Sequence, residues 1–193
     1  MSKMIEEFSN SPVIPVLTLN DIDESLKIAD ILVTNGLTNL EITLRTQNAL
    51  ACIEAINKEF PSANVGAGTI VKKEQLQSVK DVGCTFAVSP GFTKTLVEEA
   101  KNVNISYLPG ASTPSEIIQL SELGINFQKF FHAGNSGGYK MLQAYANIFS
   151  EVKFCPTGGI GQKDFADYLK LPNVVCLGGS WMVDTQKMSF EDI

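Results

Sequence analysis

The sequence has little charge, and acidic residues outnumber basic ones. Only 19% of the 193 residues are charged, against roughly a quarter in an average domain, and the formal net charge is −6. Because nucleic-acid binding depends on a basic face that neutralises phosphates, this balance argues against a nucleic-acid partner. Hydrophobic residues make up 44% of the chain, so we expect extensive buried surface, either in a core or at a subunit interface.

Long hydrophobic runs and clustered metal-binding side chains are missing as well. No apolar stretch approaches the roughly 18 residues of a membrane-spanning helix, and none near the N-terminus resembles a secretion signal, so we expect no membrane partner. The chain has one histidine, and its four cysteines are far apart: Cys52, Cys84, Cys155 and Cys176. This pattern argues against a disulfide framework or a metal site and predicts reduced thiols in the cytoplasm.

What the sequence does contain is a repeat of short apolar strands and amphipathic helices. Strand-like runs begin near Val13, Leu40, Ala63, Thr85, Ile105, Ile125, Val152 and Val174. Alternating strands and helices predict a parallel sheet of the α/β class, either a closed (β/α)8 barrel or an open doubly wound sheet. The glycine-rich turn of a dinucleotide-binding fold does not follow the first strand, which favours the barrel. We therefore expect residues 1–193 to form a single, compact (β/α)8 TIM-barrel domain.

Helix start signals lie between several of these strands. Asp21 followed by Glu24 resembles a capping box, and Thr113–Glu116 combines a cap, a proline at the first helical position and a glutamate at the third. Met4 and Phe8 are at helical spacing, and we expect this N-terminal helix to close the lower end of the barrel.

Polar side chains interrupt the second predicted strand. Glu41, Thr43 and Arg45 alternate with apolar residues and so share one face. Arg45 is the only arginine, and a guanidinium holds a carboxylate or phosphate in a bidentate fork that lysine cannot reproduce. The pattern predicts anion binding and proton transfer at the end of the strand, where barrel enzymes place their active sites. An internal Glu41–Arg45 ion pair is the alternative, and both can hold.

Lys129 is a second unusual polar residue, flanked by phenylalanines in the last third of the sixth predicted strand. An amine in apolar surroundings is a candidate nucleophile toward a carbonyl, although a lysine that extends to the rim is the alternative. Lys153 also lies in a strand, but at its start, where barrels place stabilising residues. We interpret His132, three residues after Lys129, as a rim residue.

Glycines follow the last two predicted strands. Gly158 and Gly159 follow the seventh, and Gly178, Gly179 and Ser180 follow the eighth. Phosphate-binding barrels often form their anion site from backbone N–H groups at these two loops. The pattern therefore predicts a phosphate site, with simple tight turns as the alternative.

Several motifs occur together and in a characteristic order. They are LEITLRT (40–46), VGAGT (65–69), SPG (89–91), KFF (129–131), CPTGGI (155–160) and LGGSW (177–181). In combination they resemble the bacterial 2-keto-3-deoxy-6-phosphogluconate (KDPG) aldolases, also called KHG/KDPG aldolases. The resemblance implies a class I aldolase on a (β/α)8 barrel, usually a homotrimer, with no metal and no dissociable cofactor. Its reaction would cleave KDPG to pyruvate and glyceraldehyde 3-phosphate, and often also 4-hydroxy-2-oxoglutarate (KHG) to pyruvate and glyoxylate.

The same resemblance implies roles for individual residues. Lys129 would form the Schiff base with the keto group, and Glu41 would be the general acid/base, partly through a water molecule. Arg45 would hold the pyruvate carboxylate, with Thr69 and Pro90 lining that end of the pocket.

The resemblance also implies how the rest of the substrate is bound. Phe131 would pack beside the Schiff base, and Thr157 would face the hydroxylated carbons, where a threonine favours the gluconate-type substrate. The matched positions at the phosphate-binding end are Gly158, Gly159, Gly179 and Ser180.

The chain departs from the family at two places. After KFF the family usually continues Pro-Ala-Glu, whereas this chain has His132–Gly134, a change that bears on substrate preference. The family has a further helix after the eighth strand, and Ser189–Asp192 looks like its cap, so we expect that helix to be truncated.

Two other functions compete with the aldolase. One is another phosphate-binding barrel enzyme, an isomerase or synthase without a Schiff base, and the other is a non-catalytic barrel that senses a phosphorylated metabolite. The isomerase or synthase would give Lys129 no role in the reaction, and the non-catalytic sensor would not need Glu41, Arg45 and Lys129 together.

Overall fold

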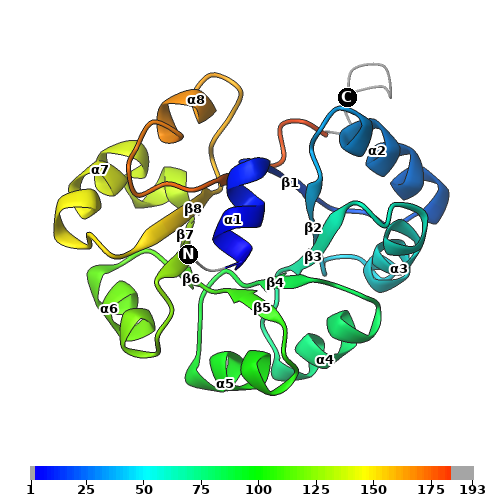
Figure 1. The fold of residues 1–193 in the computed structure, drawn as a ribbon, viewed down its shortest axis with the longest axis horizontal. Coiled ribbons are helices and arrows are strands. Elements are labelled where there is room, and N and C mark those ends of the chain that lie inside the picture. Colours follow the sequence, from blue (N-terminus) through cyan, green and yellow to red (C-terminus); the bar gives the residue numbers. More distant parts are fainter. Residues whose placement is uncertain (1–2, 184–193) are drawn as a thin grey trace.

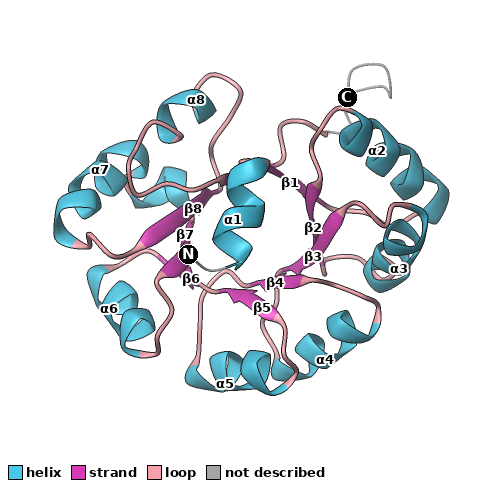
Figure 2. Ribbon diagram, in the orientation of Figure 1, coloured by secondary structure: helices cyan, strands magenta, loops and turns pink. Residues whose placement is uncertain are grey.

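The strands form a ring surrounded by helices (Figures 1 and 2). The structure is a computed structural model that describes residues 3–183. Its strands are β1 (Val13–Leu17), β2 (Asn39–Thr43), β3 (Asn64–Gly68), β4 (Phe86–Val88), β5 (Ser106–Leu108), β6 (Gly110–Ala111), β7 (Phe127–Phe131), β8 (Lys153–Thr157) and β9 (Leu177–Gly179). All the strand pairs between them are parallel.

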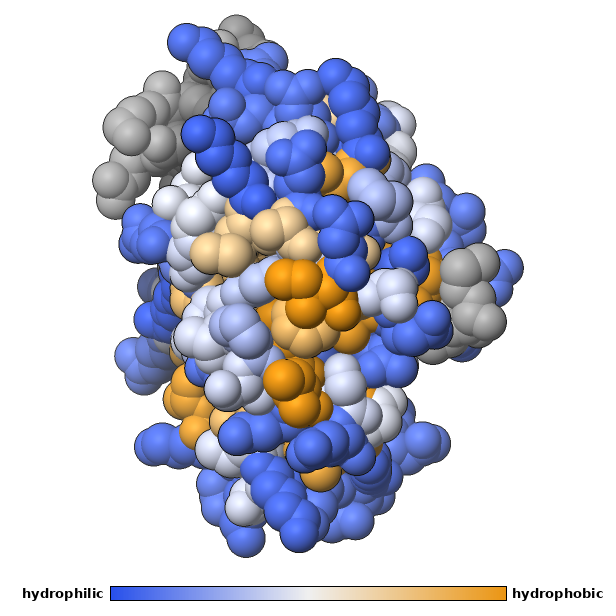
Figure 3. Space-filling view, turned by 90° about the vertical axis from the view of Figure 1, so that its left-hand side faces the viewer, coloured by the Kyte–Doolittle hydropathy of each residue, from blue (hydrophilic) through white to orange (hydrophobic). Residues whose placement is uncertain are grey.

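The helices lie on the outside, apart from the first. They are α1 (Lys3–Asn10), α2 (Ile22–Thr34), α3 (Ala49–Glu59), α4 (Lys73–Asp81), α5 (Lys94–Asn102), α6 (Pro114–Glu122), the 3-10 helix η1 (Ala133–Ser136), α7 (Gly138–Ile148) and α8 (Phe165–Tyr168). Figure 3 shows hydrophobic side chains gathered on the face that carries α6 and α7. Three large hydrophobic residues of these helices are exposed: Ile118, Met141 and Ile148.

The predicted barrel is confirmed, with one difference in the fifth strand. The sheet order is β5-β4-β3-β2-β1-β9-β8-β7-β6, and Pro109 alone separates the two end strands along the chain. Proline has no N–H to donate to a strand neighbour, so the predicted fifth strand divides there into β5, which pairs with β4, and β6, which pairs with β7. The Pro109 carbonyl accepts the Lys129 N–H at 2.8 Å, which closes the ring.

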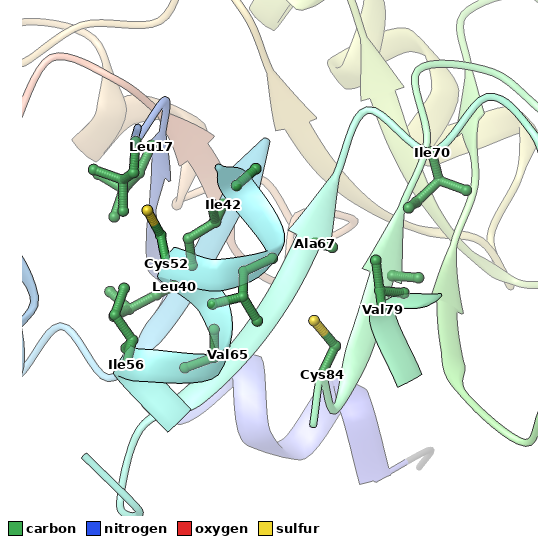
Figure 4. Close-up of a cluster of buried hydrophobic side chains, with 14 of the residues drawn as sticks. Leu17, Leu40, Ile42, Cys52, Ile56, Val65, Ala67, Ile70, Val79 and Cys84 are labelled. Carbon is green, nitrogen blue, oxygen red and sulfur yellow. The ribbon is translucent and has the colours of Figure 1, made fainter. Parts of the chain in front are cut away.

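The outer face of the sheet packs against the helices through apolar side chains. Leu40 and Ile42 of β2 are fully buried in a cluster with Cys52 and Ile56 of α3, and Figure 4 shows these four side chains in that cluster. Since side chains alternate along a strand, Glu41 between them faces the barrel interior. The alternation in β2 thus turns Leu40 and Ile42 toward the helices and Glu41 toward the polar inside of the barrel.

The N-terminal helix closes one end of the barrel, as expected. Figure 1 shows α1 lying across the centre of the ring. Phe8 is fully buried, and the centroid of its ring lies 4.9 Å from that of Phe86 and 6.0 Å from that of Phe127. Phe86 and Phe127 are the first residues of β4 and β7, so α1 covers the N-terminal ends of the strands and leaves the opposite end for the site.

The predicted helix starts are also confirmed. The Asp21 side chain caps α2 by accepting the Glu24 N–H at 2.8 Å. Thr113 and Glu116 form a reciprocal capping box at the start of α6. The cap expected at Ser189–Asp192 lies outside the described residues.

Among residues 3–183, no helix has both the length and the apolar character needed to cross a membrane.

Candidate active site

Lys129 and Glu41 meet inside the barrel. They come from β7 and β2, which are not neighbours in the sheet, yet Lys129 Nζ lies 3.2 Å from Glu41 Oε1. Both side chains are almost fully buried, with 6% and 5% of their surface exposed. An isolated charge at this depth would carry a large desolvation cost, so each group makes the burial of the other possible.

The structure also decides between the alternative readings of these residues. Lys129 is buried and does not extend to the rim, whereas Lys153, at the start of its strand, is half-buried and donates to the Pro172 carbonyl at 2.9 Å. The ion pairs of the described residues join Glu41 to Lys129 and not to Arg45.

Gly68 makes room for the Glu41 carboxylate. It lies on β3 beside β2, and a Cβ atom built on it would overlap Glu41 Oε1. Its backbone is not in the left-handed region, so the absent side chain, and not an unusual conformation, explains the glycine. The motif VGAGT contained this residue, but its contact with Glu41 is visible only in the folded chain.

Arg45 is positioned by Thr69. The Arg45 Nε–H donates to Thr69 Oγ1 at 3.1 Å. Thr69 has a φ of 64°, a left-handed conformation that is unusual for a β-branched residue. Such backbone strain is found most often at functional sites, and here it accompanies the contact with the arginine.

Pro90 lies on the loop after β4 and approaches the strand next to Lys129. A Cβ atom on Gly110 would overlap the Pro90 carbonyl oxygen, and Gly110 pairs with Lys129 between β6 and β7. The small residue therefore lets the loop of Pro90 come close to the reactive lysine.

A cavity of about 330 Å³ opens at the C-terminal ends of β1, β7, β8 and β9. Its lining includes seven of the predicted site residues: Arg45, Phe131, Thr157, Gly158, Gly159, Gly179 and Ser180. Lys129 is not part of this lining, but its Nζ lies 5.2 Å from the centroid of the ring of Phe131, which is part of it. A larger hollow of about 550 Å³ lies beside α6, away from the buried pair, and its position gives it no part in this chemistry.

The glycine loop after β8 adopts a conformation that requires glycine. Gly158 and Gly159 have φ values of 94° and 71°, and a Cβ on Gly158 would lie 2.6 Å from the ring of His132. His132, interpreted from the sequence as a rim residue, is half-buried and lines the cavity at the C-terminal ends of the strands. The sequence signal for a place in the cavity was the position of His132 directly after Phe131, at the end of a strand that carries site residues.

Among residues 3–183, no group of three or more His, Cys, Asp or Glu side chains is arranged to hold a metal ion. The charged side chains that the described part of the site brings together are the amine of Lys129, the carboxylate of Glu41 and the guanidinium of Arg45.

Comparison with known proteins places this geometry in a family. The sequence profile described as "KDPG and KHG aldolase" matches residues 4–193. The chain belongs to the KDPG and KHG aldolase family.

Relatives in this aldolase family cover nearly the whole chain. The KHG/KDPG aldolase of Escherichia coli K12 is 44% identical over 184 residues, which are 95% of this chain and 86% of that protein. The crystal structure of the 2-keto-3-deoxy-6-phosphogluconate aldolase of Zymomonas mobilis ZM4 with 3-phosphoglycerate is 40% identical and has a TM-score of 0.92, covering 97% of this chain and 90% of that one.

A third relative of the aldolase family carries a covalent ligand. The KDPG aldolase from Legionella pneumophila, with pyruvate captured at low pH as a covalent carbinolamine intermediate, is 40% identical with a TM-score of 0.92, covering 96% of this chain and 90% of that one. The predicted family and the predicted enzyme class, an aldolase among the carbon–carbon lyases, are confirmed. An isomerase, a synthase or a non-catalytic barrel is not favoured.

Proposed function

We propose that this chain is a class I aldolase that cleaves KDPG to pyruvate and glyceraldehyde 3-phosphate. The observation that carries the proposal is the buried contact of 3.2 Å between Lys129 Nζ and Glu41 Oε1. A nucleophilic amine and a proton-transferring carboxylate are the two groups that Schiff-base aldol cleavage requires. The covalent pyruvate intermediate of the Legionella relative supports the same chemistry.

In the proposed reaction, Lys129 passes a proton to Glu41, and the free amine attacks the C2 keto carbon of the substrate to form a carbinolamine. Glu41 returns the proton to the carbinolamine hydroxyl, and loss of water leaves an iminium. Glu41 then takes the proton of the C4 hydroxyl, directly or through a water molecule. The O–H electrons form the aldehyde C=O, while the C3–C4 bond breaks and its electron pair moves into the iminium to give an enamine. A proton returns to C3, and hydrolysis of the new iminium releases pyruvate and the free lysine.

The other residues of the site would hold the two ends of the substrate. Arg45 would bind the carboxylate, with Thr69 and Pro90 completing that end, and the contact of Arg45 with Thr69 supports this role. Phe131 would pack beside the Schiff base and Thr157 would face the hydroxylated carbons. Backbone N–H groups would bind the phosphate at the opposite end of the cavity, at Gly158, Gly159, Gly179 and Ser180.

KHG is a second proposed substrate. Its cleavage to pyruvate and glyoxylate uses the same amine, carboxylate and guanidinium but needs no phosphate site. A coupled assay that follows pyruvate release from KDPG and from KHG separates the two activities.

We also propose that the reaction uses no metal and no dissociable cofactor, since the iminium on Lys129 stores the electron pair that the bond cleavage releases. A cytoplasmic location agrees with the cysteines, because all four are free and buried. Burial raises the pKa of the Cys84 thiol to about 12, which keeps it protonated and poorly reactive.

The test of the mechanism is reduction with borohydride in the presence of pyruvate. We expect a stable adduct on the Lys129 peptide, located by mass spectrometry. Lys153→Met should keep the adduct and Lys129→Met should abolish it. An adduct on Lys153, or none on the wild-type protein, would overturn the mechanism.

A further inference from the structure

His132 lies at the end of the cavity that contains the glycine loop. It directly follows β7, is half-buried, and lines the cavity together with Gly158, Gly159 and Ser180. The cavity lining contains two side chains with N–H donors that suit an anion, Arg45 and His132. Arg45 donates through Nε to Thr69 and is the proposed partner of the substrate carboxylate, whereas the His132 ring lies against the glycine loop.

The imidazole ring is held in position by its surroundings. A Cβ atom on Gly158 would lie 2.6 Å from His132 Cδ2 and 2.8 Å from Nε2, and a Cβ on Gly159 would lie 3.3 Å from Cε1. The ring therefore lies against the backbone of both glycines. The Gly134 N–H donates to the Gly158 carbonyl at 2.9 Å, which ties the segment after His132 to the same loop.

The two ring nitrogens of His132 have different surroundings. Nδ1 is buried and has no hydrogen-bond partner among the described residues. In either tautomer Nδ1 makes no hydrogen bond to the described residues, so hydrogen bonding to a ligand falls to Nε2, which as an N–H suits an anion. Nε2 is not among the buried atoms without a partner, and the residue lines the cavity, so Nε2 is the ring nitrogen available to a ligand there.

We propose that His132 is a further substrate-binding residue whose Nε2–H donates a hydrogen bond to the distal phosphate of the substrate. The inference rests on the proposed function for the identity of that phosphate. Phosphate oxygens are strong acceptors, and hydrogen bonds to a charged acceptor are about twice as strong as neutral ones. His132 would thus favour phosphorylated over unphosphorylated keto acids, while the glycine N–H groups position the phosphate.

The experiment compares His132→Phe, which keeps an aromatic ring but removes the donor, with His132→Gln, which keeps an N–H donor. We expect His132→Phe to raise KM for KDPG about tenfold, with little change in kcat and no change in KM for KHG. His132→Gln should recover part of the loss. Equal increases in KM for both substrates would assign the residue a structural role only and overturn the proposal.

A binding measurement keeps this test separate from the aldolase proposal. Calorimetric titration of inorganic phosphate needs no turnover, and we expect about tenfold weaker binding to His132→Phe than to the wild-type protein. Unchanged phosphate affinity would overturn the role of His132 even in an active aldolase. Absence of the Lys129 adduct would instead overturn the mechanism, whatever the phosphate titration gives. Circular dichroism of both variants checks that they are folded.

Discussion

The positions of single side chains at this site depend on neighbouring glycines, which have no side chain to block them. Glu41 reaches Lys129 because Gly68 has no Cβ, and the loop of Pro90 approaches the lysine because Gly110 has none. The amine and carboxylate are thus placed to within one hydrogen-bond length by residues that take no part in the chemistry. Positioning of this kind matters because a displacement of about 1 Å can cost on the order of 100-fold in rate.

We therefore expect Gly68→Ala to lower kcat on the order of 100-fold while the protein stays folded. The new methyl group overlaps Glu41 Oε1 and moves the carboxylate away from Lys129. Gly161→Ala is the matched control, because a Cβ there meets nothing within 4 Å. Steady-state pyruvate release and thermal unfolding of both variants measure the effect, and a Gly68→Ala enzyme as active as the control would refute it.

At the scale of elements, each helix must satisfy its first backbone N–H groups locally. In α6 the Glu116 carboxylate accepts the Ser112 N–H at 2.9 Å and the Thr113 N–H at 2.8 Å. Burial alone would raise the pKa of Glu116, but the hydrogen bonds from Ser112 and Thr113 lower it overall below its ordinary 4.5. The capping box therefore stabilises the ionised form.

An acidic group whose pKa is lower in the folded state than in the unfolded state stabilises the fold at pH values above its ordinary pKa. This stabilisation is lost as the pH falls through the lowered pKa. We expect wild type to be more stable than Glu116→Gln near neutral pH, with a difference that shrinks as the pH falls below 4.5. The glutamine keeps an acceptor oxygen, so the comparison isolates the charge. Urea unfolding across this range measures the difference, and a constant value at every pH would contradict the expectation.

At the scale of the whole molecule, the barrel closes through a single residue. The strand order ends on β5 and β6, which only Pro109 separates. Figure 3 shows hydrophobic side chains gathered on the face that carries α6 and α7, and Ile118, Met141 and Ile148 of these helices are exposed. Exposed hydrophobic side chains that gather on one face mark interaction surfaces.

We propose that this face takes part in the homotrimer that the family resemblance implies. Sedimentation equilibrium should give three times the 20.9 kDa of one chain. Met141→Lys combined with Ile148→Lys should shift the protein toward the monomer, because buried lysines would lose hydration at the interface. Ile22→Lys, a change at another exposed hydrophobic residue, serves as the control. A monomeric wild-type protein would contradict the proposal.

The features that could be predicted from the sequence are those that local patterns encode. Short apolar runs located eight strands, and Thr113–Glu116 located a helix start, because these signals involve residues close together in the chain. The division at Pro109 depends on which neighbours each half of the strand finds in the closed ring. The contact of Gly68 with Glu41 and that of His132 with Gly158 join residues of different strands and loops, so no local pattern reveals them.

The burial of Phe8 between Phe86 and Phe127 has a consequence for the order of events during turnover. With α1 filling the lower end, the part of the chain that the structure describes leaves the barrel interior open at the opposite end, where the cavity lies. Substrate enters and products leave by the same route, and the pyruvate carbons remain bound to Lys129 at the bottom of it. The aldehyde, nearer the mouth, must depart first, so the proposed aldolase releases its products in a fixed sequence.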